Sequence, residues 1–165
     1  IAGKFAEIHF DTVPWVVYTD PEIAWVGKTE RELKDAGIPY TTGSFPLAAN
    51  GRALAGGQGQ GLVKMLAHAE TDEILGVHIL GANASELIGE CVVAMEFQGC
   101  SEDLARIVHA HPTLSEAMGE AAESMTMPPE TVTAMTVEAT TWVPFGRSGT
   151  RLPAAPKPMI RVTPR

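Results

Sequence analysis

Apolar and β-branched residues gather in short runs along the chain, separated by polar, proline- or glycine-containing stretches. In one run Val77 and Ile79 alternate with His78 and Leu80, a period of two that is typical of a strand with one buried face. The preceding run is joined to it by four polar residues, which indicates an antiparallel hairpin. We predict strands at residues 13–18, 23–26, 40–45, 62–67 and 74–80.

Helices are predicted where capping patterns precede residues at helical spacing. Thr29 with Glu32 forms a capping-box pattern and Gly37 suits the position after a helix, so a short helix is expected at about residues 30–35. Asn83 is expected to cap a longer helix, because Glu86 follows three residues on and an apolar stripe begins there. The stripe, suited to packing on a sheet, is formed by Leu87, Ile88, Cys91, Val92 and Met95.

Two more helices are predicted near the end of this region. Gly99 is expected to end the long helix, and Ser101 to cap a short one. Thr113 and Glu116 form a second capping-box pattern before a last helix. Most strands therefore precede most helices, which predicts an α+β fold: a two-layer domain with an antiparallel sheet of about four or five strands and helices on one face.

Residues 56–61, Gly-Gly-Gln-Gly-Gln-Gly, include the Gly-x-Gly spacing of phosphate-binding loops. No Lys-Ser/Thr pair follows, and the next segment has a strand pattern instead of a helical one. We therefore interpret this stretch as a hairpin connection.

Charge and proline content divide the chain at about residue 125. Residues 1–125 contain 18 acidic and 7 basic residues, a net charge of −11, whereas residues 126–165 contain 2 acidic and 5 basic residues, a net charge of +3. Seven of the twelve prolines lie in the second part, whose composition disfavours helix and sheet. We predict one globular domain at residues 1–125 and a flexible, proline-rich tail at residues 126–165.

The overall composition excludes several classes of function. A net charge of −8 argues against general nucleic-acid binding and against attachment to anionic membranes. No apolar run is long enough to span a bilayer, so we expect a cytoplasmic protein without a membrane partner. Cys91 and Cys100 match neither a zinc knuckle nor a redox Cys-x-x-Cys pair, and both are expected to be buried thiols.

The richest stretch for chemistry is His-Ala-His-Pro-Thr-Leu-Ser-Glu at residues 109–116, and three interpretations of it compete. In the plainest, Glu116 caps a helix and the histidines fill a loop, which the residue types alone favour. In a second, His109, His111 and Glu116 bind a metal, although no third His or Cys lies close by, and we expect no metal. In the third, a carboxylate orients one imidazole that moves protons near neutral pH.

The same stretch resembles the C-terminal signature of the dihydrolipoamide dehydrogenase family of flavoprotein disulfide reductases. Further segments resemble that family in order and spacing, at residues 13–27, 45–53, 74–81 and 83–88. The match in order and spacing extends over about residues 1–125, which is far more specific than one motif. The part resembled is the dimerisation, or interface, domain of these pyridine nucleotide-disulfide oxidoreductases.

This resemblance implies a catalytic role in trans. In the family, the interface domain of one subunit completes the active site of the other, with His111 as the acid/base and Glu116 as its orienting partner. His111 and Pro112 are then expected to lie against the partner subunit's flavin. His109 is the less favoured catalyst, because the family motif gives that role to the histidine directly before proline. The implied parent enzyme uses FAD and NAD, acts on a lipoyl domain and is a homodimer.

The sequence also departs from the whole family pattern. It contains neither glycine-rich dinucleotide fingerprint nor the redox cysteines separated by four residues. We therefore expect no FAD or NAD bound to this chain alone and no independent dehydrogenase activity. Two alternatives stay open: a non-catalytic dimerisation module that pairs with itself or with a subunit bearing the FAD and NAD domains, and the interface domain of a relative such as glutathione reductase.

Overall fold

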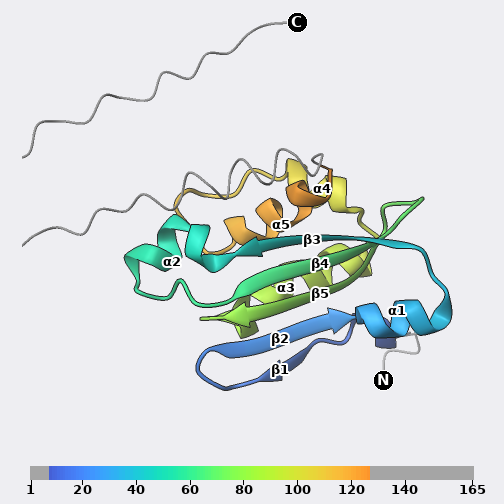
Figure 1. The fold of residues 1–165 in the computed structure, drawn as a ribbon, viewed down its shortest axis with the longest axis horizontal. Coiled ribbons are helices and arrows are strands. Elements are labelled where there is room, and N and C mark those ends of the chain that lie inside the picture. Colours follow the sequence, from blue (N-terminus) through green and yellow to red (C-terminus); the bar gives the residue numbers. More distant parts are fainter. Residues whose placement is uncertain (1–7, 127–165) are drawn as a thin grey trace, which may run out of the picture.

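A five-stranded antiparallel sheet forms the centre of the computed structural model, which describes residues 8–126 (Figure 1). Its strands follow the order β1-β2-β5-β4-β3, so the β4–β5 hairpin lies in the middle. The predicted α+β class and the predicted hairpin are confirmed. The strands are β1 (Trp15–Val17), β2 (Glu22–Gly27), β3 (Tyr40–Pro46), β4 (Leu62–His68) and β5 (Ile74–Gly81).

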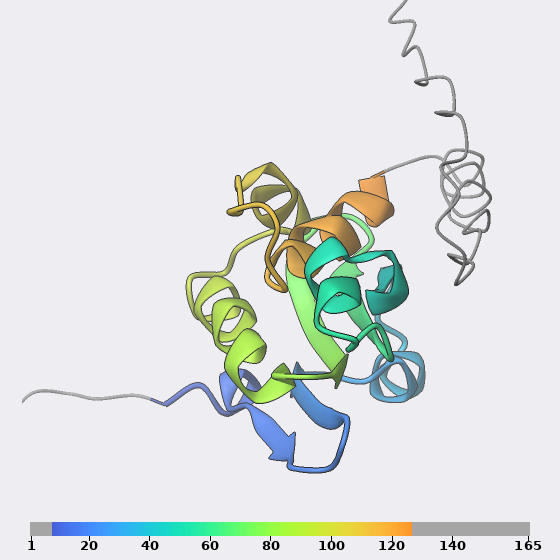
Figure 2. The same cartoon turned by 90° about the vertical axis from the view of Figure 1, so that its left-hand side faces the viewer.

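The two longest helices pack on one face of this sheet (Figure 2). Helix α3 (Ala84–Glu96) lies on β2 and β5, and α5 (Glu116–Thr126) lies on β3 and β4. The short α4 (Ser101–Arg106) packs on α5 instead of on the sheet. Two further short helices, α1 (Glu30–Ala36) and α2 (Gly51–Ala55), follow β2 and β3, and single 3-10 turns occur at η1 (Phe10–Thr12) and η2 (Leu47–Ala49).

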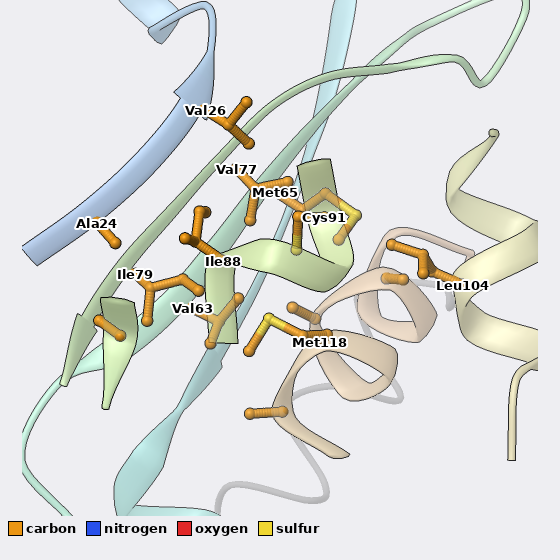
Figure 3. Packing of buried hydrophobic residues seen from close by; sticks show 14 of the residues in the cluster. Ala24, Val26, Val63, Met65, Val77, Ile79, Ile88, Cys91, Leu104 and Met118 are labelled. Atoms are coloured by element: carbon orange, nitrogen blue, oxygen red, sulfur yellow. The ribbon is translucent and has the colours of Figure 1, made fainter. Parts of the chain in front are cut away.

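The core lies between the sheet and these helices (Figure 3). The strand register places the core residues of the sheet in two rows that cross β2, β5, β4 and β3 in that order. One row consists of Val26, Val77, Met65 and Gly43, and the other of Ala24, Ile79, Val63 and Phe45. Ile88 and Cys91 of α3 and Met118 of α5 cover these rows and are buried. The predicted apolar stripe of α3 therefore faces the sheet, as its spacing indicated.

The opposite face of the sheet carries polar and aromatic residues. Trp15 and Trp25 stack with ring centroids 6.2 Å apart, and register continues this row through His78 and Lys64. Helix α1 reaches this face at one end, because Glu30 accepts a hydrogen bond from Lys64 Nζ at 2.5 Å. Both ring nitrogens of His78 are shielded from solvent without a hydrogen-bond partner among residues 8–126.

The ends of the helices match the sequence patterns unequally. Helix α1 has the complete capping box of Thr29 and Glu32, and Gly37 follows it in the left-handed conformation, as predicted. Asn83 precedes α3, but its side chain makes no capping bond, so that prediction is wrong. The carboxylate of Glu22, from the neighbouring strand β2, accepts from the Ser85 N–H at 2.9 Å instead.

Helix α4 is also capped from outside its own segment. Ser101 is its first helical residue and not its cap, since Cys100 occupies that position. Asp72, in the β4–β5 turn, accepts hydrogen bonds from Ser101 Oγ at 2.5 Å and from the Glu102 N–H at 2.9 Å. The predicted cap is therefore replaced by a carboxylate about thirty residues away in the sequence.

The glycine-rich stretch leads from α2 into β4 and completes the connection between the antiparallel neighbours β3 and β4. The strand that follows it agrees with the hairpin interpretation, although the connection also includes η2 and α2. Gly61 has φ +113°, and a side chain there would collide with the Leu80 carbonyl group, so glycine is required.

The predicted division at residue 125 stays a prediction, because residues 127–165 lie outside the described residues. Within residues 8–126, every helix is too short or too polar to cross a lipid bilayer.

Candidate active site

The loop between α4 and α5 carries the residues that the sequence singled out. It runs through Ile107, Val108 and His109 to the cis His111–Pro112 bond, and most of its side chains are exposed. Helix α5 begins directly after it, so the sheet positions this loop through α5.

His111 and Glu116 form a close pair on the surface of this loop. The Nδ1 atom of His111 lies 2.7 Å from Glu116 Oε1, within hydrogen-bonding distance. The His111 side chain is 80% exposed, whereas that of Glu116 is only 21% exposed. The imidazole is therefore braced from the inside by a carboxylate and open to the outside, and Nε2 has no hydrogen-bond partner within residues 8–126.

The second oxygen of Glu116 binds the loop backbone. The Thr113 N–H donates to Glu116 Oε2 at 2.9 Å. This bond, followed by the His111 contact, lowers the pKa of Glu116 below its ordinary value. Glu116 is thus an ionised carboxylate at neutral pH, and its two oxygens are both engaged.

The capping box predicted for Thr113 and Glu116 forms only in part. Glu116 does bind the Thr113 N–H, but the Thr113 hydroxyl contacts Ser115 Oγ at 3.0 Å instead of a helical N–H. The helix begins at Glu116, two residues after the position that the pattern implied. The carboxylate therefore orients the loop and the imidazole more than it caps a helix at Thr113.

The packing of α5 fixes Glu116 relative to the sheet. The side of α5 that faces the core is made of Ala117, Met118, Ala121 and Ala122, all fully buried. Gly43 of β3 lies so close to α5 that any side chain there would overlap Ala121 and Met125. Glu116 consequently extends from a helix end that cannot easily shift.

His109 belongs to a second and separate pair. Its Nε2 atom lies 2.6 Å from Glu90 Oε1 of α3, and its side chain is only 11% exposed. His109 and His111 therefore bind different carboxylates. Across residues 8–126, no group of three His, Cys, Asp or Glu side chains has the arrangement of a metal site, which counts against the metal interpretation of His109, His111 and Glu116.

Sequence reasoning missed two residues that hold this loop. Glu90 binds His109, and Asn50 of the β3–β4 connection donates from Nδ2 to the Thr113 carbonyl oxygen at 2.9 Å. Glu90 lies in the predicted helix that Asn83 precedes, and Asn50 lies in the family-like segment 45–53, but neither was predicted as a site residue. Their contacts with this loop leave no local signal, because the partners His109 and Thr113 lie 19 and 63 residues away.

The two cysteines do not form a redox pair. Both thiols are free: Cys91 is buried in the core, and its pKa is raised to about 12 by that burial. Cys100, which directly precedes α4, is only partly buried, contrary to the expectation. Its thiol donates to Asp103 Oδ2 at 3.1 Å, which raises its pKa.

Comparison with known proteins identifies relatives of this domain. The chain is 62% identical over 122 residues to dihydrolipoyl dehydrogenase from Cupriavidus necator, covering 74% of this chain and 26% of that protein. It is 54% identical over 122 residues to the mitochondrial dihydrolipoyl dehydrogenase of Pisum sativum, covering 74% and 24%. The chain thus spans about a quarter of the length of these curated relatives.

Solved structures agree with this result. LpdA from Mycobacterium tuberculosis has a TM-score of 0.69 and 31% identity, with 73% of this chain and 26% of that chain covered. The HOCl-induced flavoprotein disulfide reductase RclA from Escherichia coli has a TM-score of 0.65 and 25% identity, with 67% of this chain and 26% of that chain covered.

Residues 13–122 match the family described as "Pyridine nucleotide-disulphide oxidoreductase, dimerisation domain". The chain therefore belongs to the family of pyridine nucleotide-disulphide oxidoreductase dimerisation domains, and it is similar to that domain of dihydrolipoyl dehydrogenases.

Proposed function

We propose that this domain supplies His111 and Glu116 in trans to a flavin and disulfide site on a partner subunit, for the NAD-dependent oxidation of dihydrolipoamide. The observation that carries the proposal is the exposed imidazole held at 2.7 Å by a half-buried carboxylate. An imidazole that serves another subunit must face outward, and its orientation must be fixed from within its own domain. The His111–Glu116 pair has both properties.

The proton transfer follows from the hydrogen bond to Glu116. When Nδ1–H donates to the carboxylate, the neutral imidazole keeps its lone pair on Nε2, which faces away from the domain. Nε2 then accepts the proton of a dihydrolipoamide thiol. The resulting thiolate attacks one sulfur of the partner's disulfide, the S–S bond breaks, and a mixed disulfide forms.

The second substrate thiol completes the exchange. The imidazolium first gives its proton to the enzyme sulfur that the S–S cleavage released, and Nε2 then takes the proton of the second thiol. The second thiolate attacks the substrate sulfur of the mixed disulfide, so that lipoamide is released as a disulfide and the enzyme holds two reduced sulfurs. Two electrons have passed from substrate to enzyme. Glu116 stays ionised throughout, because its low pKa lets it stabilise the imidazolium instead of accepting the proton.

The parent enzyme would use FAD and NAD. This chain would contribute only contacts at the edge of the flavin site. His111 and Pro112 are exposed at the loop, a position that fits contact with a flavin held by another subunit. When bound there, the flavin would accept electrons from the reduced sulfurs and pass them to NAD. The proposed partners are a second copy or a subunit that bears the FAD and NAD domains, together with a lipoyl-domain substrate. The isolated chain is expected to bind neither cofactor.

A domain exchange tests this proposal. The matched 122 residues of the Cupriavidus necator dihydrolipoyl dehydrogenase are replaced by those of this chain, which gives the chimaeric enzyme. His111→Gln should leave flavin binding unchanged but slow the oxidation of dihydrolipoamide by about 100-fold or more, the usual scale of general acid–base catalysis. His9→Gln is the matched control, because His9 also pairs with a glutamate, Glu96, on the surface. Near-normal turnover of the His111 variant, or an inactive chimaera, would contradict the assignment.

A second candidate is a dimerisation module without catalytic function. It is favoured by large apolar side chains left exposed on the domain, among them Phe97 at 83% and Val108 at 95%. Sedimentation of the purified 165-residue chain measures whether it dimerises. Both candidate functions allow a dimer, so this result is read together with the turnover of the chimaeric enzyme. A dimer that forms while His111→Gln has no effect in the chimaeric enzyme would favour the module.

Two finer assignments remain proposals as well. The lipoyl substrate is preferred over that of a relative such as glutathione reductase, because the two curated relatives cited above are named dihydrolipoyl dehydrogenases. The cytoplasmic location is the other, and the mitochondrial relative in Pisum sativum is the reason to test it by fractionation.

A further inference from the structure

Asn50 is one of only two buried polar residues within residues 8–126, with 3% of its surface exposed. Both ends of its amide are used. Its Oδ1 accepts from the Ala53 N–H at 2.9 Å, which caps α2, and its Nδ2 donates to the Thr113 carbonyl oxygen at 2.9 Å. The side chain therefore joins a helix in the β3–β4 connection to the loop that carries His111.

The backbone of Thr113 connects Asn50 with the His111–Glu116 pair. Its carbonyl oxygen is held by Asn50, and its N–H holds Glu116 Oε2 at 2.9 Å. The other oxygen of Glu116 contacts His111 Nδ1 at 2.7 Å. A continuous series of three hydrogen bonds thus runs from the buried amide to the exposed imidazole.

We propose that Asn50 is a positioning residue, which fixes the Thr113 backbone so that Glu116 holds the His111 imidazole in its reactive orientation. This inference rests on the proposed function. The ring is 80% exposed and is held by Glu116, so its position depends on how the loop backbone and that carboxylate are held. On the other side of His111, the His109–Glu90 pair anchors the same loop to α3.

Helix capping alone does not require an asparagine at this position. Capping uses only the side-chain oxygen, and Ser or Asp serves that purpose about as well as Asn. The bond to Thr113 needs an N–H donor that reaches a distant carbonyl group, which neither Ser nor Asp provides. The two roles of Asn50 can therefore be separated by substitution.

The test uses the chimaeric enzyme with Asn50→Ser, which keeps a capping oxygen and removes the donor to Thr113. Turnover with dihydrolipoamide is expected to fall about 10-fold. This loss is smaller than the roughly 100-fold loss of rate that a 1 Å displacement of a catalytic group can cause. The KM for NAD should stay unchanged. Asn50→Ala is the comparison variant, because it removes both the cap and the donor and should lower thermal stability further. Should the serine variant fail to fold, Asn50→Asp takes its place, since it also keeps the cap and lacks the donor.

A double-mutant cycle with His111→Gln decides how Asn50 acts. If Asn50 works through His111, Asn50→Ser should cause no further loss of turnover once His111 has been replaced. The same 10-fold loss in both backgrounds would mean a merely structural role and would overturn the inference. Normal turnover of the Asn50 variants beside a slow His111→Gln enzyme would also overturn it, while leaving the proposed function intact. A His111→Gln enzyme of normal rate would instead refute the proposed function.

Discussion

Replacement of Gly43 by alanine tests whether α5 approaches the sheet as closely as the structure shows. Gly43 lies in β3 beneath α5, opposite Met65 of β4. Three atoms of α5, from Ala121, Ser124 and Met125, would lie within 3.0 Å of an added Cβ, a distance that real Cβ atoms essentially never show. One of them is a backbone oxygen, which cannot rotate away as the end of a side chain can.

The expected cost follows from this overlap. Ordinary carbon–oxygen contacts are near 3.3 Å or longer, so α5 would have to move outward by roughly 1 Å. Overpacking of this kind destabilises a protein by about 1–3 kcal/mol. Alanine also has less backbone freedom than glycine in the unfolded chain, which stabilises the folded state by about 0.4–1 kcal/mol where the strand conformation suits alanine. Gly43→Ala should therefore lower the free energy of unfolding by about 1–2 kcal/mol.

Gly89→Ala is the matched control, since it makes the same chemical change at an exposed position in the middle of α3. Nothing lies within 4 Å of a Cβ at Gly89, so this variant should gain about 0.5–1 kcal/mol from helix propensity. Urea unfolding of the 165-residue chain, followed by far-ultraviolet circular dichroism, measures both values. If Gly43→Ala is as stable as the unchanged chain, the close contact between β3 and α5 is wrong.

Three further outcomes are expected for the same chain. Met118→Ala should lower the free energy of unfolding by about 2–5 kcal/mol, because Met118 is fully buried between α5 and the sheet, and a loss well under 1 kcal/mol would mean that this core is loosely packed. Ellman's reagent at pH 8 should leave Cys91 unmodified until the chain is unfolded, because burial raises the pKa of this thiol to about 12 and only a thiolate reacts. Rapid reaction of both thiols in the folded chain would contradict the burial of Cys91. Burial, followed by the charge of Lys64, lowers the pKa of His78 in the folded chain below 6.5. The stability that the neutral ring contributes is therefore present above pH 6.5 and is lost as the pH falls through the lower folded-state pKa. His78→Phe should make the free energy of unfolding less dependent on pH in that window, and an unchanged pH dependence would count against the burial of this ring.

The strand runs and the complete capping box of α1 could be predicted because they depend on neighbours in the sequence. A period of two exposes one side of a strand and buries the other whatever the partner strand is. Thr29 and Glu32 lie three residues apart, so their reciprocal hydrogen bonds form within one helical turn. Such features need no knowledge of the rest of the molecule.

Two of the failures, at the starts of α3 and α4, share one physical cause, which is that a distant residue took over a local role. Asn83 was expected to cap α3, but the carboxylate of Glu22 in the adjacent strand reaches the helix start and satisfies the N–H group of Ser85. Asp72 does the same for α4 in place of Ser101. In each case the sheet brings a carboxylate to a helix end, where unpaired N–H groups and a positive dipole favour it.

The sequence by itself determined the strands and the α+β class, and it predicted His111 and Glu116 as site residues through a run of residues that resembles a known family. Only the tertiary structure decided how that pair is held: His109 is tied to Glu90 and the Thr113 backbone to Asn50, across 19 and 63 residues of chain. The physical reason is that a hydrogen bond depends on positions in space, which the folded sheet and its helices set and which spacing along the chain does not record.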